Sequence, residues 1–333
     1  MKISNGRGYS RRDFIRLTGK GAGFVALSSL PLALTACDPD RYFYFAVIAD
    51  THIIDEFYKG PESNPVDTES MFKTAERYTA ARDVINSLDP KIEAVFIAGD
   101  YIHNYPSRDY DFYFSNRTRF DIVKEITAGF NMPVYPCFGN HDYDLPDIPL
   151  EFSHALFREK WGLDPYYYID LKGFRFIHLN NYLGCSMDPE SGKYNNDLGS
   201  FGEEQLLWLE ALLAEKKPSF VFFHQPMIMI MPNEIGDLDV FSVLNKHRNC
   251  VKMVIAGHWH RWVDFSWLFG VRHMVCASTR YDGDSYMIIE VDRQTQGFRI
   301  LNWPCYQWIT FNTAPYTQSQ HKYLAKGAWA KNT

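Results

Sequence analysis

The chain has 333 residues, of which 46% are hydrophobic and 16% aromatic, so it can build one large α/β domain with a substantial core. Its 34 basic and 40 acidic side chains give a formal net charge of −6 at pH 7, which excludes a strongly basic nucleic-acid-binding protein. The absence of internal repeats and low-complexity tracts excludes repeat architectures, and one compact domain is expected.

The N-terminal segment, residues 1–36, is predicted to be an export signal and not part of the fold. Ser10–Arg16 reads Ser-Arg-Arg-Asp-Phe-Ile-Arg and looks like a twin-arginine signal. The uncharged stretch Gly21–Ala36 is shorter than the roughly 20 apolar residues that a membrane-spanning helix needs. We therefore expect export by the twin-arginine machinery; the alternative is an unstructured cytoplasmic N-terminus.

Cys37 is the candidate lipidation site, because Leu34-Thr35-Ala36-Cys37 resembles the lipobox of bacterial lipoproteins. A diacylated Cys37 would begin the mature chain, with residues 37–42 as a tether to the membrane. The expected location is the bacterial cell envelope, on the periplasmic or extracytoplasmic side. Residues 1–36 hold six basic residues and one acidic residue, so the remainder has a formal charge of −11 and no long nucleic acid is expected as a partner.

Five hydrophobic runs along the chain are short and rich in β-branched and aromatic residues, which predicts buried strands. A polar cluster follows each run directly, at the carboxyl end of the predicted strand. In open α/β sheets ligands bind at that edge, so the clusters are expected to meet in one crevice. The runs are Tyr42–Ala49, Ile92–Ala98, Val134–Phe138, Phe220–Phe223 and Lys252–Ala256. The clusters are Asp50-Thr51-His52, Gly99-Asp100, Gly139-Asn140-His141-Asp142, His224-Gln225-Pro226 and Gly257-His258-Trp259-His260.

These clusters contain seven candidate metal ligands. A mixture of oxygen and imidazole donors suits manganese, iron or zinc better than calcium, and the lack of cysteine argues against a structural zinc site. Two metals need a shared ligand, which a carboxylate provides through its two oxygens. Residues two apart on a strand point to the same side, so Asp50 with His52 and His258 with His260 are predicted to act as pairs. The candidates are Asp50, His52, Asp100, Asn140, His224, His258 and His260.

Two helices are predicted between these clusters. One lies within Asp67–Leu88 and completes a βαβ unit between the first two strands. The other begins at a capping box formed by Ser200 and Glu203 and continues to Leu213, with an apolar face suited to packing on a sheet.

The ordered combination of clusters resembles the calcineurin-like metallophosphoesterase superfamily, over roughly Phe43 to Val291. The resemblance implies an α/β fold, an α/β/β/α sandwich of two mixed sheets flanked by helices. We place this domain at residues 43–301 and assign residues 302–333 to an aromatic-rich C-terminal extension that covers a sheet edge.

The resemblance also implies roles for the candidate residues. Asp100 would bridge the two metals, and His141 would be the general acid. Asp142 would either orient the His141 imidazole or close a turn. His103 occupies the position of the tyrosine ligand of purple acid phosphatases, which disfavours that subgroup and makes His103 a candidate to support the metal ligands. One metal would be held by Asp50, His52 and His260, and the other by Asn140, His224 and His258.

The function implied is a binuclear metal-dependent phosphoesterase in which a hydroxide held between the metals attacks phosphorus. Small phosphate monoesters are the favoured substrates. A phosphodiesterase acting on cyclic nucleotides or glycerophosphodiesters is the alternative within enzymes, and a non-catalytic, membrane-tethered binding protein is the alternative of another class. The aromatic and apolar loops Tyr101–Tyr113, Tyr143–Phe157 and Met227–Met231 would either form a substrate-stacking rim or pack on the domain.

Five cysteines follow the predicted signal. An odd number cannot pair completely, and several lie in or beside predicted strands, where a thiol packs as a small hydrophobic group. Because twin-arginine substrates cross the membrane folded, we expect a fold that does not depend on disulfides. The cysteines are Cys137, Cys185, Cys250, Cys276 and Cys305.

Overall fold

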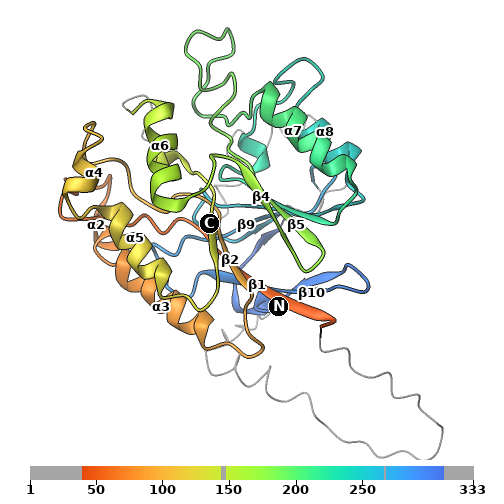
Figure 1. The fold of residues 1–333 in the computed structure, drawn as a ribbon, viewed down its shortest axis with the longest axis horizontal. Coiled ribbons are helices and arrows are strands. Elements are labelled where there is room, and N and C mark those ends of the chain that lie inside the picture. The colour runs from red at the N-terminus through yellow and green to blue at the C-terminus, as the bar shows by residue number, and fades with distance from the viewer. Residues whose placement is uncertain (1–39, 144–147, 266–267, 311–333) are drawn as a thin grey trace, which may run out of the picture.

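Two β-sheets lie face to face at the centre of the protein, and helices cover their outer faces (Figure 1). The computed structural model describes residues 40–143, 148–265 and 268–310. The predicted export signal and Cys37 lie outside the described residues, as does the predicted C-terminal extension beyond Thr310. No helix of the described segments is both long and apolar enough to cross a membrane.

Within the described residues, the first sheet has five strands in the order β11-β10-β1-β2-β3. β1, β2 and β3 pair in parallel, and β10 pairs antiparallel with both β1 and β11. The strands are β1 (Tyr42–Ile48), β2 (Ala94–Ile97), β3 (Val134–Pro136), β10 (Tyr286–Asp292) and β11 (Phe298–Ile300).

The second sheet has seven strands in the described part of the chain, in the order β12-β8-β9-β7-β6-β5-β4. Its central strands β5, β6, β7 and β9 are parallel, while β4 is antiparallel to β5 and β8 is antiparallel to β9 but parallel to β12. The strands are β4 (Tyr167–Leu171), β5 (Phe174–His178), β6 (Ser219–Phe222), β7 (Val251–Ala256), β8 (Val263–Asp264), β9 (His273–Val275) and β12 (Ile309–Thr310).

One group of helices packs on the outer face of the first sheet and another on the second, which confirms the predicted α/β/β/α sandwich of two mixed sheets. The first group is α2 (Pro65–Met71), α3 (Thr74–Asn86), α4 (Phe112–Ser115), α5 (Arg119–Ala128) and α6 (Leu150–Trp161). The second is α7 (Glu203–Ala214) and α8 (Val240–Lys246). Short 3-10 turns are η1 (Asn140–Asp142), η2 (Met227–Met229) and η3 (Trp303–Cys305).

A layer of phenylalanines joins the two sheets. In β1 the side chains alternate, so that Phe43, Phe45 and Val47 face the second sheet while Ala46 and Ile48 face the helices. The Phe45 ring lies 5.4 Å from Phe96 on β2, and it lies 5.1 and 5.0 Å from Phe176 and Phe220 on the opposite sheet. Both faces of the parallel strands are therefore buried, as parallel sheets require.

All five predicted strands are present, each within two residues of the predicted bounds at either end. The helix expected within Asp67–Leu88 is instead two helices, α2 and α3, and Asn64 caps the first by accepting a hydrogen bond from the backbone of Asp67. The predicted capping box at Ser200 is wrong, because Gly202 is the N-cap of α7 with a φ of 80°. The backbone N–H groups of Phe201 and Gly202 donate to Glu234, a partner distant in sequence.

The fold extends past residue 301, where we had expected a separate extension to begin. β12 pairs with β8 at the edge of the second sheet, and Tyr306 stacks on Trp262 with ring centres 4.0 Å apart. Residues 302–310 therefore belong to the packed domain and cover a sheet edge. The five cysteines are all free thiols.

His178 is a buried histidine whose two ring nitrogens have no hydrogen-bond partner. It stacks between Tyr167 and Phe222, at 4.5 and 5.0 Å. Burial lowers the pKa of His178 to about 3. Above pH 6.5 the ring is neutral in both the folded and the unfolded state. Below that pH only the unfolded state takes up the proton, so folding stability is lost as the pH falls.

We predict that His178→Phe raises the free energy of unfolding at pH 5 by about 2 kcal/mol more than it does at pH 7.5. Urea unfolding of both proteins at the two pH values measures this difference, and any packing change caused by the larger ring cancels in the comparison. An equal effect at both pH values would show that His178 is not the proton-linked group.

Candidate metal centre

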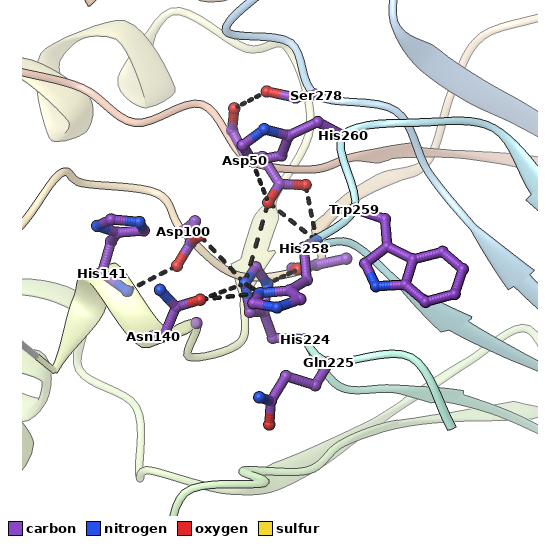
Figure 2. A network of polar contacts seen from close by, with 12 residues as sticks. Asp50, Asp100, Asn140, His141, His224, Gln225, His258, Trp259, His260 and Ser278 are labelled. Carbon is purple, nitrogen blue, oxygen red and sulfur yellow. Dashed lines mark hydrogen bonds and ion pairs between the residues drawn. The ribbon is translucent and has the colours of Figure 1, made fainter. Parts of the chain in front are cut away.

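The predicted ligands come together at the carboxyl ends of strands from both sheets, and Figure 2 labels all of them except His52. Asp50, Asp100 and Asn140 follow β1, β2 and β3 of the first sheet, while His224 and His258 follow β6 and β7 of the second. The Asp50 carboxylate accepts a hydrogen bond from the backbone N–H of His258 at 3.0 Å, which ties the two sheets together at this edge.

The backbone is left-handed at most of these positions. The φ angles are 54° at Asp50, 45° at His52, 53° at Asp100, 71° at His258 and 55° at His260. Each such residue costs on the order of 1 kcal/mol or more and persists where surrounding structure holds it, often at functional sites. Our prediction that His258 and His260 share one face of a strand is wrong, since both lie beyond β7 and their rings enter different donor sets. Asp50 and His52 also lie beyond β1, but their ligand atoms converge in one donor set.

His52 and His260 form one donor set with the two aspartates. The Nε2 atoms of His52 and His260 are 3.2 Å apart. His260 Nε2 lies 3.3 Å from Asp50 Oδ1, and His52 Nε2 lies 3.5 Å from Asp100 Oδ2. The ligand atoms of these four residues all lie within 4.8 Å of one another.

Asn140, His224 and His258 form the second donor set. Asn140 Oδ1 lies 3.1 Å from His224 Nε2 and 3.0 Å from His258 Nδ1, and the two ring nitrogens are 3.2 Å apart. Asp100 Oδ2 lies 3.1 Å from His224 Nε2. The same carboxylate oxygen therefore faces both donor sets.

These spacings fit metal coordination. Ligands about 2.1 Å from a metal ion are about 3.0–3.4 Å from one another in octahedral or tetrahedral geometry. Hydrogen bonding does not account for the convergence, because His224 Nε2 faces Asp100, Asn140 and His258 at once and carries at most one proton. The two donor sets are suited to hold two metal ions with Asp100 between them.

The buried charges favour an ionised carboxylate at the centre. Burial raises the pKa of Asp100, but the imidazoles of His224 and His141 outweigh burial and hold that pKa well below its usual range. Burial lowers the pKa of His224, but the carboxylates of Asp100 and Asp50 outweigh it and raise the pKa to about 9. Asp100 therefore stays ionised at neutral pH, as a bridging ligand must.

Glycines allow the clusters to approach one another. A Cβ atom on Gly139 would collide with the carboxylate and the backbone of Asp100. A Cβ atom on Gly99 would collide with the His224 ring, and Gly99 also has a φ of 86°. The Gly-Asp and Gly-Asn-His-Asp patterns are thus explained by close contact between neighbouring loops.

His141 lies beside the donor sets, and its ring is held by Asn104. The distance from His141 Nδ1 to Asn104 Oδ1 is 2.5 Å. Asp142 does not take this position: its carboxylate accepts hydrogen bonds from the backbone of Gly139 at 2.7 Å and of Ile102 at 3.0 Å. Of the two roles left open for Asp142, orienting His141 or closing a turn, the structure has the turn-closing one, so Asp142 is not assigned a catalytic role. Asn104 has no motif that would have identified it from sequence.

A hollow of about 320 Å³ opens beside the second donor set, lined by Asn140, His141 and His258 among others. The aromatic loop Tyr101–Tyr113 mostly packs on the domain, since Tyr101 and Tyr113 are fully buried. Met229 and Tyr143, from the other two loops, do line the hollow.

The family model for calcineurin-like phosphoesterases matches residues 43–262. The chain belongs to the calcineurin-like phosphoesterase family. Two similar curated proteins are the serine/threonine-protein phosphatases CPPED1 of Danio rerio and Bos taurus, each 26% identical. The matches cover 54% and 66% of this chain, and 58% and 69% of those proteins. The chain thus spans well under two thirds of the Danio rerio relative.

A solved dimetal phosphatase from Danio rerio has the same fold. It superposes with a TM-score of 0.52 at 19% identity, over 74% of this chain and 92% of that one. At this identity the likeness establishes only the fold. The chemical assignment of this phosphoesterase-family chain is argued from its own site residues.

His103 supports the donor sets of this phosphoesterase-family chain from behind. Its Nδ1 lies 3.2 Å from His52 Nδ1, and its Nε2 lies 3.3 Å from Glu62 Oε1. Nε2–H of the neutral His103 ring donates to Glu62, so the ring's Nδ1 carries no proton and accepts a hydrogen bond from Nδ1–H of His52. The Nε2 atom of His52 is then unprotonated and free to bind a metal ion. Sequence alone indicated His103 from its spacing to Asp100, whereas Glu62 lies in a loop without a recognisable pattern.

We predict that His103→Phe weakens binding of the metal ion on the His52 side by about 10- to 100-fold and leaves the second metal less affected. Calorimetric titration of metal into the metal-free protein measures both sites. His247→Phe, at a histidine on the C-cap of α8 remote from the site, is the control. Equal weakening of both sites would indicate a general structural effect.

Proposed function

We propose that this chain is a binuclear metal-dependent phosphoesterase that favours phosphate monoesters. The observation that carries the proposal is the position of Asp100, whose Oδ2 lies 3.5 Å from His52 in one donor set and 3.1 Å from His224 in the other. Manganese, iron and zinc suit this mixture of oxygen and imidazole donors. When bound, two such ions would acidify water to supply a nucleophile and would neutralise charge on the phosphoryl group.

His141 is placed to protonate the leaving oxygen. Because the amide oxygen of Asn104 only accepts hydrogen bonds, it holds the proton on His141 Nδ1 and directs Nε2 to exchange a proton with the substrate. Burial lowers the pKa of His141, and the nearby Asp100 carboxylate opposes this effect. A lowered pKa strengthens the imidazolium as an acid.

Phosphomonoesters are favoured because the similar Danio rerio and Bos taurus proteins are named serine/threonine-protein phosphatases. Phosphodiester substrates are the alternative, and turnover of matched mono- and diesters distinguishes the two. A binding protein that has lost catalysis is disfavoured by the complete set of buried donors, since buried polar groups are costly to retain without a partner.

We also propose that the protein is exported by the twin-arginine machinery and anchored by a lipid on Cys37 in the bacterial cell envelope. The support is the pattern of residues 10–37, together with free cysteines that are compatible with folding before export.

The metal assignment predicts about two transition-metal ions per chain and loss of activity on chelation. Asp100→Asn should lower the occupancy of both sites, because Asp100 Oδ2 faces both donor sets, whereas His260→Ala should lower only one. Elemental analysis of the purified proteins tests this. No more than one ion in fully active protein would contradict the binuclear assignment.

The general-acid assignment predicts a dependence on the leaving group. His141→Ala should keep both metals but lose about 10²- to 10⁴-fold in turnover of alkyl phosphates, whose leaving oxygen needs a proton. Nitrophenyl phosphate should be much less affected, since nitrophenolate leaves without protonation. An equal loss across the whole series would instead mean that His141 positions the phosphoryl group.

The anchor assignment predicts that Cys37→Ser releases the protein from the membrane fraction without abolishing its chemistry, since stable attachment needs the acyl chains. Changing Arg11 and Arg12 together to Lys should block export. Fractionation and intact mass measure both effects. A Cys37→Ser protein of unchanged apparent mass that remains with the membrane would refute lipidation.

A further inference from the structure

The hollow beside the donor sets has a distinctive charge pattern. Its described lining consists of neutral amides, tyrosines and methionines, together with the site histidines, and contains no lysine or arginine. The carboxylate in that lining is Asp197. Phosphate dianions are usually recognised by cationic side chains. With no lysine or arginine in the described lining, metal ions held by the donor sets would have to bind the phosphoryl group, and the rest of the hollow would be open to the leaving group.

The position of Asp197 is held by its loop. The Asp197 backbone N–H donates to Asn195 Oδ1 at 3.1 Å. Two residues further on, Gly199 donates to the carbonyl of Met229 at 2.8 Å, which ties the loop to the segment that follows His224. The lysine of the same loop, Lys193, donates at 2.8 Å to the carbonyls of Asn233 and Glu234, so it is committed elsewhere.

A leaving group with its own negative charge would meet Asp197 without a compensating cation from the described lining. An ammonium group would meet the carboxylate, and the apolar side chains of Met187 and Met229, which also line the hollow, would pack against its alkyl substituents. Asp197 is exposed, and two charges about 5 Å apart in water interact by roughly 1 kcal/mol, which changes affinity several-fold.

We propose that the preferred substrates are phosphate monoesters of amino alcohols, such as phosphocholine, with the ammonium group facing Asp197. The inference rests on the proposed function of the same site. In the reaction, water supplies the oxygen that bonds to phosphorus, the bond from phosphorus to the alcohol oxygen breaks, and the alcohol leaves with a proton.

The test compares three substrates on metal-loaded protein: phosphocholine, its uncharged isostere 3,3-dimethylbutyl phosphate, and an anionic analogue with a carboxylate in place of the ammonium. The ammonium group also makes choline a better leaving group. For that reason the quantity to follow is the ratio of kcat/KM for phosphocholine to that for the isostere, compared between wild type and variants.

Asp197→Asn should lower this ratio about 3- to 10-fold, and Asp197→Lys should lower it further and improve turnover of the anionic analogue. Asp188→Asn is the matched control: Asp188 is an exposed acid of the same loop outside the hollow, and it should leave the ratio unchanged. Added salt should reduce the difference between wild type and Asp197→Asn.

An unchanged ratio in Asp197→Asn overturns the inference while leaving the phosphoesterase proposal intact. A change of equal size in Asp188→Asn also overturns it, because the effect would then be the net charge of the loop. Absence of turnover on all three substrates with both metals bound contradicts the proposed function itself, and this inference with it.

Discussion

The packing of the two sheets on a shared phenylalanine layer is the interaction on which the rest of the structure depends. Phe96 of the first sheet stacks on Phe176 of the second at 4.6 Å, and it lies 4.9 Å from Phe222. Phe222 is the last residue of β6, two residues before His224, and Phe96 lies four residues before Asp100. Contact between these rings therefore aligns the carboxyl ends of the strands of both sheets along one edge of the sandwich, where the donor sets meet.

The metal centre, without bound metal, lowers the stability of the folded state. It concentrates buried carboxylates and imidazoles at one edge of the core, and it holds several of them in left-handed backbone conformations. Such an arrangement persists only where the surrounding structure is rigid, and the packed aromatic layer between the two sheets provides that rigidity. Metal binding would return part of this free energy, because a site that exists only in the folded state stabilises that state when occupied.

The loops around the site divide the remaining tasks. The segment after β2 places two consecutive side chains, with His103 against His52 and Asn104 against His141. Asn104 itself is left-handed, with a φ of 56°. Asp197, on the loop that ends in Gly199, lines the hollow. Positioning of the ligands and selection of the substrate are thus carried by separate segments on one scaffold.

The sequence by itself determined the strands, the order of the polar clusters and the set of candidate ligands. This succeeded because the alternation of Phe43, Phe45 and Val47 and the abrupt change from apolar to polar residues at Asp50 are local properties of the chain. The helix over Glu203–Ala214 was likewise visible from its apolar spacing.

Only the tertiary structure decided how those residues are used. The divergence of His258 and His260 depends on left-handed turns that strand periodicity does not describe. The cap of α7 depends on Glu234, and the partner of His103 is Glu62, which approaches from a different loop. Asp142 faces its own turn because Gly139 and Ile102 offer N–H groups there. These outcomes depend on which hydrogen-bonding groups folding brings together. Those groups are often distant in sequence, so the local sequence does not show which partner will be near.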